Sequence, residues 1–215
     1  MKIKYLGHAS FLITSDKGVK IITDPYKPGC FNNGIRYSPI NEPSDIVTIS
    51  HEHDDHNETK IQGNPVFVRG AGKKNIKDVT ITGIDVYHDE SQGKERGKNT
   101  IFNMSIDEMN IVHLGDIGHA LSTADVQKIG NVDVLLVPVG GYFTVDAKLA
   151  DDIIKTLKPK VIIPMHFKTS KCGFPIAPVD DFTRNKAYKK VDGEIAIEKG
   201  GLPPNPTIYV LTPTK

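Results

Sequence analysis

The feature that most constrains this chain is a histidine-rich segment, His51-Glu52-His53-Asp54-Asp55-His56, which directly follows an apolar run over residues 45–50. That run is mostly β-branched, which predicts a buried strand and places the histidines in the loop at its C-terminal end. Open α/β sheets bind their ligands at this end of the strands. We therefore expect a ligand site in this loop.

The spacing within the segment is that of metal ligands. His51 and His53 are two apart in an extended chain, so both imidazoles leave the backbone on the same side and can bind one ion. Asp55 and His56 form a second pair, which suits a neighbouring ion, and two ions about 3.5 to 4 Å apart form a hydrolytic two-metal site. A solvated polar loop is the weaker interpretation, because so many ligand types directly follow a buried strand.

The composition limits the number of domains, the partners and the cellular location that we expect. The chain has 215 residues and no Pro/Gly/Ser-rich linker, so we expect a single domain over residues 1–215. A formal net charge of +1 gives no general affinity for nucleic acid or membranes. Cys30 and Cys172 are far apart and indicate no disulfide framework. The first residues read as a strand with no signal-peptide pattern, and no apolar run is long enough to cross a membrane, so a cytoplasmic location is expected.

The order of the predicted elements divides the chain in two. The first half reads as strands and the second alternates strand with helix. Residues 26–43 have no periodicity. Their length fits a mobile insertion equally well, but they precede the strand that leads to the histidines, so they are interpreted as a lid or substrate wall. Strands are predicted at 2–6, 10–14, 19–23, 45–50, 65–69, 79–82, 84–87, 100–105, 110–114, 133–138, 161–164, 194–197 and 207–211, and helices near 58–62, 122–130, 146–157 and 179–188.

Further ligand types follow three later apolar runs, because His88, Asp116 and His166 each come at the end of a predicted strand. These residues can converge with the 51–56 loop on one sheet edge. The simplest arrangement lets the Asp116 carboxylate bridge two ions. It assigns His51, His53 and His88 to one ion and Asp55, His56 and His166 to the other.

His113 competes with His88 for the third place on the first ion. It lies in mid-strand, three residues before Asp116, and strand alternation sends those two side chains to opposite faces. We therefore prefer His88 and interpret His113 as a packed or hydrogen-bonded histidine.

With these residues in place, the chain resembles the metallo-β-lactamase superfamily. Residues 51–56 fit its HxHxDH signature, Asp24 matches its first motif, and the ligand types at the three later strand ends follow in order. Segments that resemble a compact, lactonase-like branch of uncharacterised hydrolases are Gly7-His8-Ala9-Ser10-Phe11, His88-Asp89-Glu90, His113-Leu-Gly-Asp116-Ile-Gly-His119 and Ile163-Pro-Met-His166. The resemblance implies an α/β fold, a four-layer αβ/βα sandwich with the metals at the sheet edge. Ile117 departs from the Thr often found after the bridging Asp.

The predicted activity is that of a metal-dependent hydrolase. Two divalent ions, zinc first with manganese or iron as alternatives, would share a hydroxide that attacks an ester, lactone, amide or phosphodiester. Asp55 and Asp116 are expected to orient this nucleophile. His8 and His119 are candidates to donate a proton to the leaving group or to hydrogen-bond the substrate, and a loop-capping role is an equally open interpretation of His119. Asp24 is expected to orient a histidine rather than to bind metal.

The expected partner is a small-molecule substrate, which can be anionic, with nucleic acid and membrane disfavoured and a homo-oligomer left open. Arg96, Lys98 and Lys168 lie near ligand-bearing strand ends and are candidates to hold an anion, although solvated surface is the commoner role of such residues. Two other functions use the same residues: a di-iron redox enzyme, and a non-catalytic binding protein on the same scaffold. A (β/α)₈ barrel is rejected because the chain opens with antiparallel strands.

Overall fold

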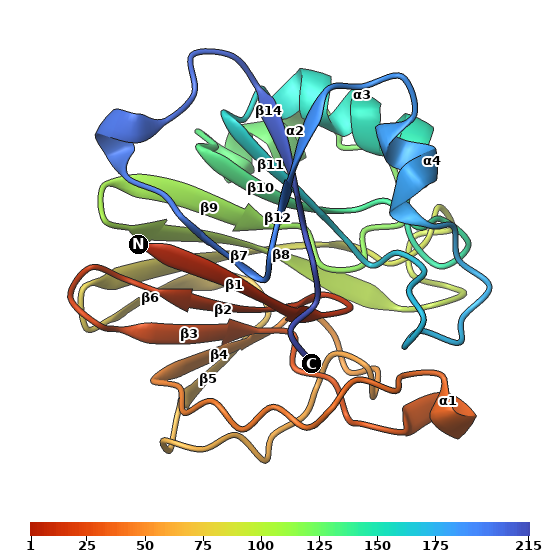
Figure 1. The fold of residues 1–215 in the computed structure, drawn as a ribbon, viewed down its shortest axis with the longest axis horizontal. Coiled ribbons are helices and arrows are strands. Elements are labelled where there is room, and N and C mark those ends of the chain that lie inside the picture. The colour runs from red at the N-terminus through yellow and green to blue at the C-terminus, as the bar shows by residue number, and fades with distance from the viewer.

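The computed structural model describes all of residues 1–215 and shows two β-sheets packed face to face (Figure 1). The first sheet has the order β13 (Glu194–Ala196), β1 (Lys2–Gly7), β2 (Ser10–Thr14), β3 (Lys20–Thr23), β4 (Ile46–Ile49) and β5 (Val66–Arg69). The second has the order β12 (Tyr188–Val191), β14 (Thr207–Leu211), β11 (Val161–Met165), β10 (Val134–Pro138), β9 (Met109–His113), β8 (Lys98–Ile106), β7 (Val79–Tyr87) and β6 (Gly72–Ile76). The helices are α1 (Cys30–Asn33), α2 (Thr123–Ile129), α3 (Ala147–Leu157) and α4 (Val179–Thr183), with a 3₁₀ turn at Lys199–Gly201.

Two of the helices beside the second sheet, α2 and α3, begin at residues whose side chains cap them. Ser122 and Asp125 make a reciprocal capping box at the start of α2. The Asp146 carboxylate accepts the Leu149 N–H at the start of α3, which ends before Pro159 because proline cannot continue a helix. In Figure 1, α2, α3 and α4 lie along the outer side of the second sheet. The sequence therefore predicts α2 and α3 from local signals.

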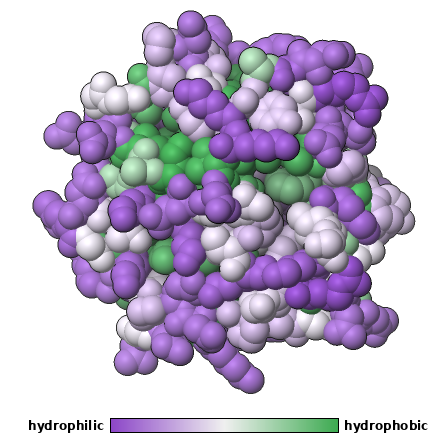
Figure 2. All heavy atoms as spheres, in the orientation of Figure 1, coloured by the Kyte–Doolittle hydropathy of each residue, from purple (hydrophilic) through white to green (hydrophobic).

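Two hydrophobic cores hold the layers together. The larger has 43 buried residues, fills the space between the sheets and extends under the helices. The smaller has 11 buried residues and lies on the other face of the first sheet, where Tyr26, Ile35 and Tyr37 cover Ile22 and Val47. Figure 2 shows hydrophobic residues as a band across the middle of one face, with hydrophilic side chains above and below. The long irregular segment after β3 thus forms part of the outer layer of the first sheet.

Strand direction decides where the site lies. β3 and β4 are parallel, and so are β9, β10 and β11. β7 runs in the same direction as β9 because both pair antiparallel with β8. The Thr100 N–H donates to the Ser50 carbonyl at 2.9 Å and joins the two sheets next to these strand ends. The carboxyl ends of these six strands therefore meet at one edge of the sandwich.

The mixed α/β fold with two sheets confirms the predicted fold class, although several elements differ from the prediction. Residues 58–62 form no helix, and the helix at 179–188 stops at Thr183, so the chain can add β12 beside β14. The strands predicted at 79–82 and 84–87 are one continuous strand, β7. β6 was missed because its Lys-rich sequence carries no apolar alternation. No helix of the structure is both long enough and apolar enough to cross a membrane.

Candidate metal centre

The carboxyl ends of the strands bring the predicted ligands together. The 51–56 loop follows β4, His88 follows β7, Asp116 lies three residues after β9, and His166 follows β11. Donor atoms of His51, His53 and His88 lie within 4.8 Å of one another and form a first group. Because β4 belongs to the first sheet and β7 to the second, the first group depends on both sheets.

A second group contains His8, Asp55, His56 and His166, whose donor atoms also lie within 4.8 Å of one another. Asp55, His56 and His166 are the set predicted for the second ion. The His8 Nε2 lies 3.0 Å from an oxygen of Asp55, and its ring centroid is 4.1 Å from that of His166. The structure therefore places His8 directly against the predicted ligands.

Asp116 stands between the two groups. Its Oδ2 lies 3.2 Å from Nε2 of both His56 and His166, and 3.4 Å from Nε2 of His88. The backbone holds it there, because the Asp116 N–H donates to Asn99 Oδ1 at 3.0 Å. A Cβ at Gly115 would lie only 2.2 Å from that oxygen, and φ there is +56°, so this position requires glycine. Asp116 is the one carboxylate that contacts histidines of both groups.

Asp24 and Ser50 fix the orientation and the tautomer of two of the histidines. His56 Nδ1 donates to Asp24 Oδ2 at 3.0 Å. The Ser50 hydroxyl also donates to Asp24 Oδ2, so its oxygen accepts the N–H of His51 Nδ1 at 2.8 Å. Both rings therefore carry a proton on Nδ1, which leaves Nε2 as the ring atom that would bind an ion. Asp24 has the orienting position expected of it, and Ser50 adds a second connection that the sequence reasoning missed.

The charges of the buried site favour a cation. Burial alone would raise the pKa of Asp116, but His166 and His56 outweigh it and hold that pKa well below its usual range. Burial alone would lower the pKa of His56, but Asp116 and Asp55 raise it well above the ordinary value. Burial, reinforced by His166, lowers the pKa of His8 to about 4. Ionised carboxylates and mostly neutral imidazoles are the donors that a metal needs, and binding would displace the proton of His56.

Several buried polar atoms of the site lack a hydrogen-bond partner, which agrees with a metal site. Nε2 of His51, His56 and His166 and Oδ1 of Asp116 are buried and have no hydrogen-bond partner. Unpartnered buried polar atoms destabilise a fold, and they are rare unless they bind an ion or water. The donor set is imidazole nitrogen and carboxylate oxygen, which zinc, iron and manganese accept. The residues present therefore fit the two ions predicted from the sequence.

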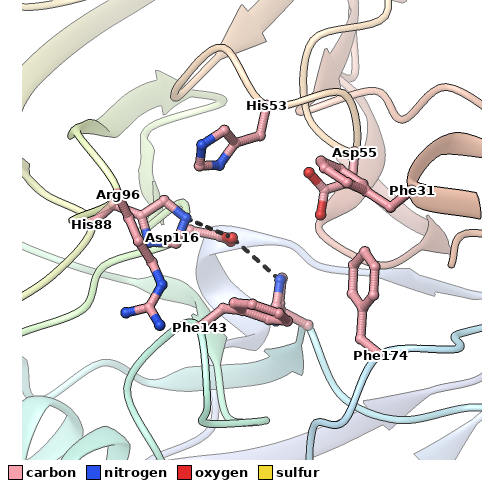
Figure 3. Close-up of a pocket in the computed structure, with 9 residues that line it drawn as sticks. Phe31, His53, Asp55, His88, Arg96, Asp116, Phe143 and Phe174 are labelled. Carbon is pink, nitrogen blue, oxygen red and sulfur yellow. Dashed lines mark ion pairs between the residues drawn. The ribbon is translucent and has the colours of Figure 1, made fainter.

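The centre opens into a cavity of about 200 Å³ with two unlike walls (Figure 3). We call one the ligand wall; it consists of His53, Asp55, His88, Asp116 and His166. We call the other the loop wall; it consists of Phe31, Arg96, Phe143 and Phe174. Phe31 comes from the segment interpreted as a substrate wall, whereas the aromatic side chains at 143 and 174 were not singled out because isolated phenylalanines in loops carry no periodic signal.

The structure separates the other two histidines from the centre. His113 Nε2 donates to the Ala9 carbonyl, and its Nδ1 accepts the Gly115 N–H, which gives it the packed, hydrogen-bonded position expected. His119 does not have the position expected of a proton donor. Its Nε2 accepts the Tyr87 N–H at 3.1 Å, its Nδ1 bonds to the Ala120 carbonyl, and it does not line the cavity. Two hydrogen bonds to the backbone hold this ring outside the cavity, where it connects two loops.

The three candidate anion-binding residues occupy different positions relative to the cavity. Arg96 lines the cavity. Lys168 donates through Nζ to the Phe174 carbonyl at 2.5 Å, and Lys98 lines a different surface hollow. Only Arg96 therefore has the position expected of a residue that contacts substrate.

A family model described as a beta-lactamase superfamily domain matches residues 2–166. A protein from Archaeoglobus fulgidus named UPF0173 metal-dependent hydrolase is 28% identical, with 94% of this chain and 97% of the relative covered. A Thermotoga maritima protein, whose structure is described as that of a Zn-dependent hydrolase of the metallo-beta-lactamase superfamily, is 35% identical with a TM-score of 0.82, covering 98% of this chain and 97% of that one. The chain belongs to the metallo-β-lactamase superfamily. This confirms the predicted superfamily and fold.

A more distant structure shares the fold alone. It is the metallo hydrolase Igni18 from Ignicoccus hospitalis, which is 23% identical with a TM-score of 0.68 over 100% of this chain and 96% of that one. The alignment covers nearly all of both chains, so the overall fold persists at low sequence identity.

Proposed function

We propose that this chain is a metal-dependent hydrolase with two metal ions, most simply zinc, that cleaves an ester, lactone, amide or phosphodiester bond of a small molecule. One observation carries the proposal. Two separate groups of donors share the Asp116 carboxylate and face a cavity that can admit a substrate. The names of the similar proteins support the same class of reaction.

The residues would divide as the geometry groups them. One ion would bind to His51, His53 and His88, and the other to Asp55, His56 and His166, with Asp116 between them. Two such ions supply an ionised water at neutral pH and polarise the bond to be cleaved. The chain's own part is to fix these donors in direction and to shield them partly from bulk water.

His8 has a supporting role in this proposal. Its Nε2 donates to Asp55, which leaves the second oxygen of that carboxylate for an ion. Because burial lowers the pKa of His8 to about 4, the ring is neutral at pH 7 and carries no extra proton for a leaving group. We therefore assign His8 the orientation of Asp55 rather than the proton donation expected from its motif.

Metal content tests the proposal. Protein purified without chelator is expected to contain close to two zinc ions per chain by elemental mass spectrometry, and Asp116→Ala fewer, with hydrolysis reduced at least about a hundredfold. Glu52→Gln is the matched control from the same motif, because that exposed carboxylate bonds to Arg69 and Asn57 instead of the centre. A chain that holds one ion or none after reconstitution at neutral pH would contradict the two-metal centre.

A further inference from the structure

The loop wall contains one charged group with unused hydrogen-bonding capacity. The Arg96 guanidinium lies over the Phe143 ring, 5.7 Å from its centroid, and makes no side-chain hydrogen bond. Its nearest carboxylate is that of the exposed Glu95, 4.0 Å away. A guanidinium has five N–H donors in a planar fork that matches a carboxylate or phosphate. Arg96 is therefore a cation at the cavity with its donors free.

Asp89 fixes the loop that carries Arg96. This buried carboxylate accepts four backbone N–H groups, from Ser91 and Gly93 on one oxygen and from Glu95 and Arg96 on the other, at 2.8 to 3.1 Å. Asp89 is only 3% exposed and directly follows the ligand His88. The position of Arg96 relative to the metal ligands is thus set by the backbone.

The aromatic side chains complete the wall. Phe174 contacts Phe31 and Phe143 edge to face, with centroids 5.8 and 5.6 Å apart (Figure 3). Phe31 is 53% exposed and has a left-handed backbone with φ of 50°, as does Asn32 with φ of 54°. A strained, exposed phenylalanine at a cavity mouth gains little from the core, and such strain gathers at functional sites. The ring is placed to contact a ligand.

Resting on the proposed function, we propose that the substrate is a compact anion with an aromatic or branched apolar group. Its carboxylate or phosphate binds Arg96, its apolar group packs against Phe31, Phe143 and Phe174, and its scissile bond faces Asp116. The cavity of about 200 Å³ suits one ring, since a cavity of about 150 Å³ holds benzene. Arg96 and the three phenylalanines thereby select the substrate, and the ligand wall carries out the reaction.

A matched pair of esters tests the charge. The zinc-loaded protein is expected to hydrolyse para-acetoxybenzoate with a kcat/KM at least about tenfold above that of its neutral methyl ester. Arg96→Met should remove this preference, mainly by raising KM, and should change the neutral ester less than about threefold. Lys94→Met is the control, because it removes one positive charge from the same loop at an exposed side chain that lines none of the larger cavities.

Equal rates for the two esters in the wild type, or equal losses in Arg96→Met, would overturn the proposal while leaving hydrolysis itself intact. If neither ester is cleaved, a ligand-binding measurement tests the preference for an anion independently of hydrolysis. Benzoate or phenylphosphonate should bind the zinc-loaded protein more tightly than benzyl alcohol does in titration calorimetry, and the tighter of the two identifies the anion. Unchanged affinity for both anions in Arg96→Met would mean that the metals alone hold them, which also overturns the proposal.

Phe31→Gly tests the apolar part. Glycine adopts the left-handed backbone without strain, so the melting temperature should not fall, yet KM for both aromatic esters should rise about threefold to tenfold. Asn32→Gly relieves the same kind of strain in the same turn and should leave KM unchanged. If both variants leave KM unchanged, Phe31 does not contact the substrate and the apolar part of the proposal is wrong.

Discussion

The two walls of the cavity are built in opposite ways. The ligand wall comes from strand ends and is mostly buried. Asn99 holds the backbone of Asp116, and the adjacent rings of His56 and His51 are fixed by Asp24 and Ser50. The loop wall comes from irregular segments and leaves Phe31 53% exposed. Chemistry that must hold ions to a fraction of an ångström needs the rigid sheet edge, whereas substrate selection can be placed on loops. The comparison predicts that perturbations of the two walls have different consequences.

Metal removal should have the largest effect, and only on the ligand wall. Ions that bind the folded state add about 4 kcal/mol to the free energy of unfolding when zinc is a thousandfold above its Kd. Chelation should therefore lower the melting temperature and speed hydrogen exchange in residues 51–56, while the 91–97 loop keeps its protection. Equal loss of protection in both segments would mean that the walls form one cooperative unit.

Asp24→Asn should have the next largest effect, because it weakens the support of His56 directly and of His51 through Ser50. Zinc affinity measured by chelator competition should fall about tenfold to a hundredfold. Ser50→Ala should cost less, since it leaves the Asp24–His56 bond in place. Ser10→Ala is the control, because that buried hydroxyl has no hydrogen-bond partner. An Asp24→Asn affinity within threefold of wild type would refute the orienting role.

Asp89→Asn should affect the loop wall and spare the metals. The substitution replaces one of the two oxygens that accept the four N–H groups with an NH₂ group, which cannot accept them. The 91–96 loop should therefore loosen, and Arg96 should lose its fixed position. We expect zinc content to remain unchanged and KM for an anionic ester to rise about threefold to tenfold. A loss of zinc in this variant would show that Asp89 acts through the adjacent His88 instead.

His119→Ala should have the smallest effect. Both of its ring nitrogens bond to backbone, and its side chain does not line the cavity. Zinc content should be unchanged and kcat should fall less than about threefold, with at most a small decrease in melting temperature. A kcat loss above about tenfold, with an altered pH profile, would restore His119 as a proton donor.

The sequence by itself determined the strand ends and the residue types at them. Apolar runs stop directly before His51, His88 and His166, and this pattern predicts both the sheet edge and the ligand types without any tertiary information. The caps at Ser122 and Asp146 likewise mark the starts of α2 and α3. These features depend on neighbouring residues in the sequence, so they can be predicted without knowledge of the tertiary structure.

Only the tertiary structure decided how the ligands are supported and what faces them. Asn99 reaches Asp116, Asp24 reaches His56, and Phe31 meets Phe174 across large sequence separations that no local pattern records. His8 and His119 have equally suggestive motifs, yet packing directs one ring into the centre and ties the other to backbone. The physical reason is that side-chain direction at a loop depends on which backbone groups the fold leaves beside it.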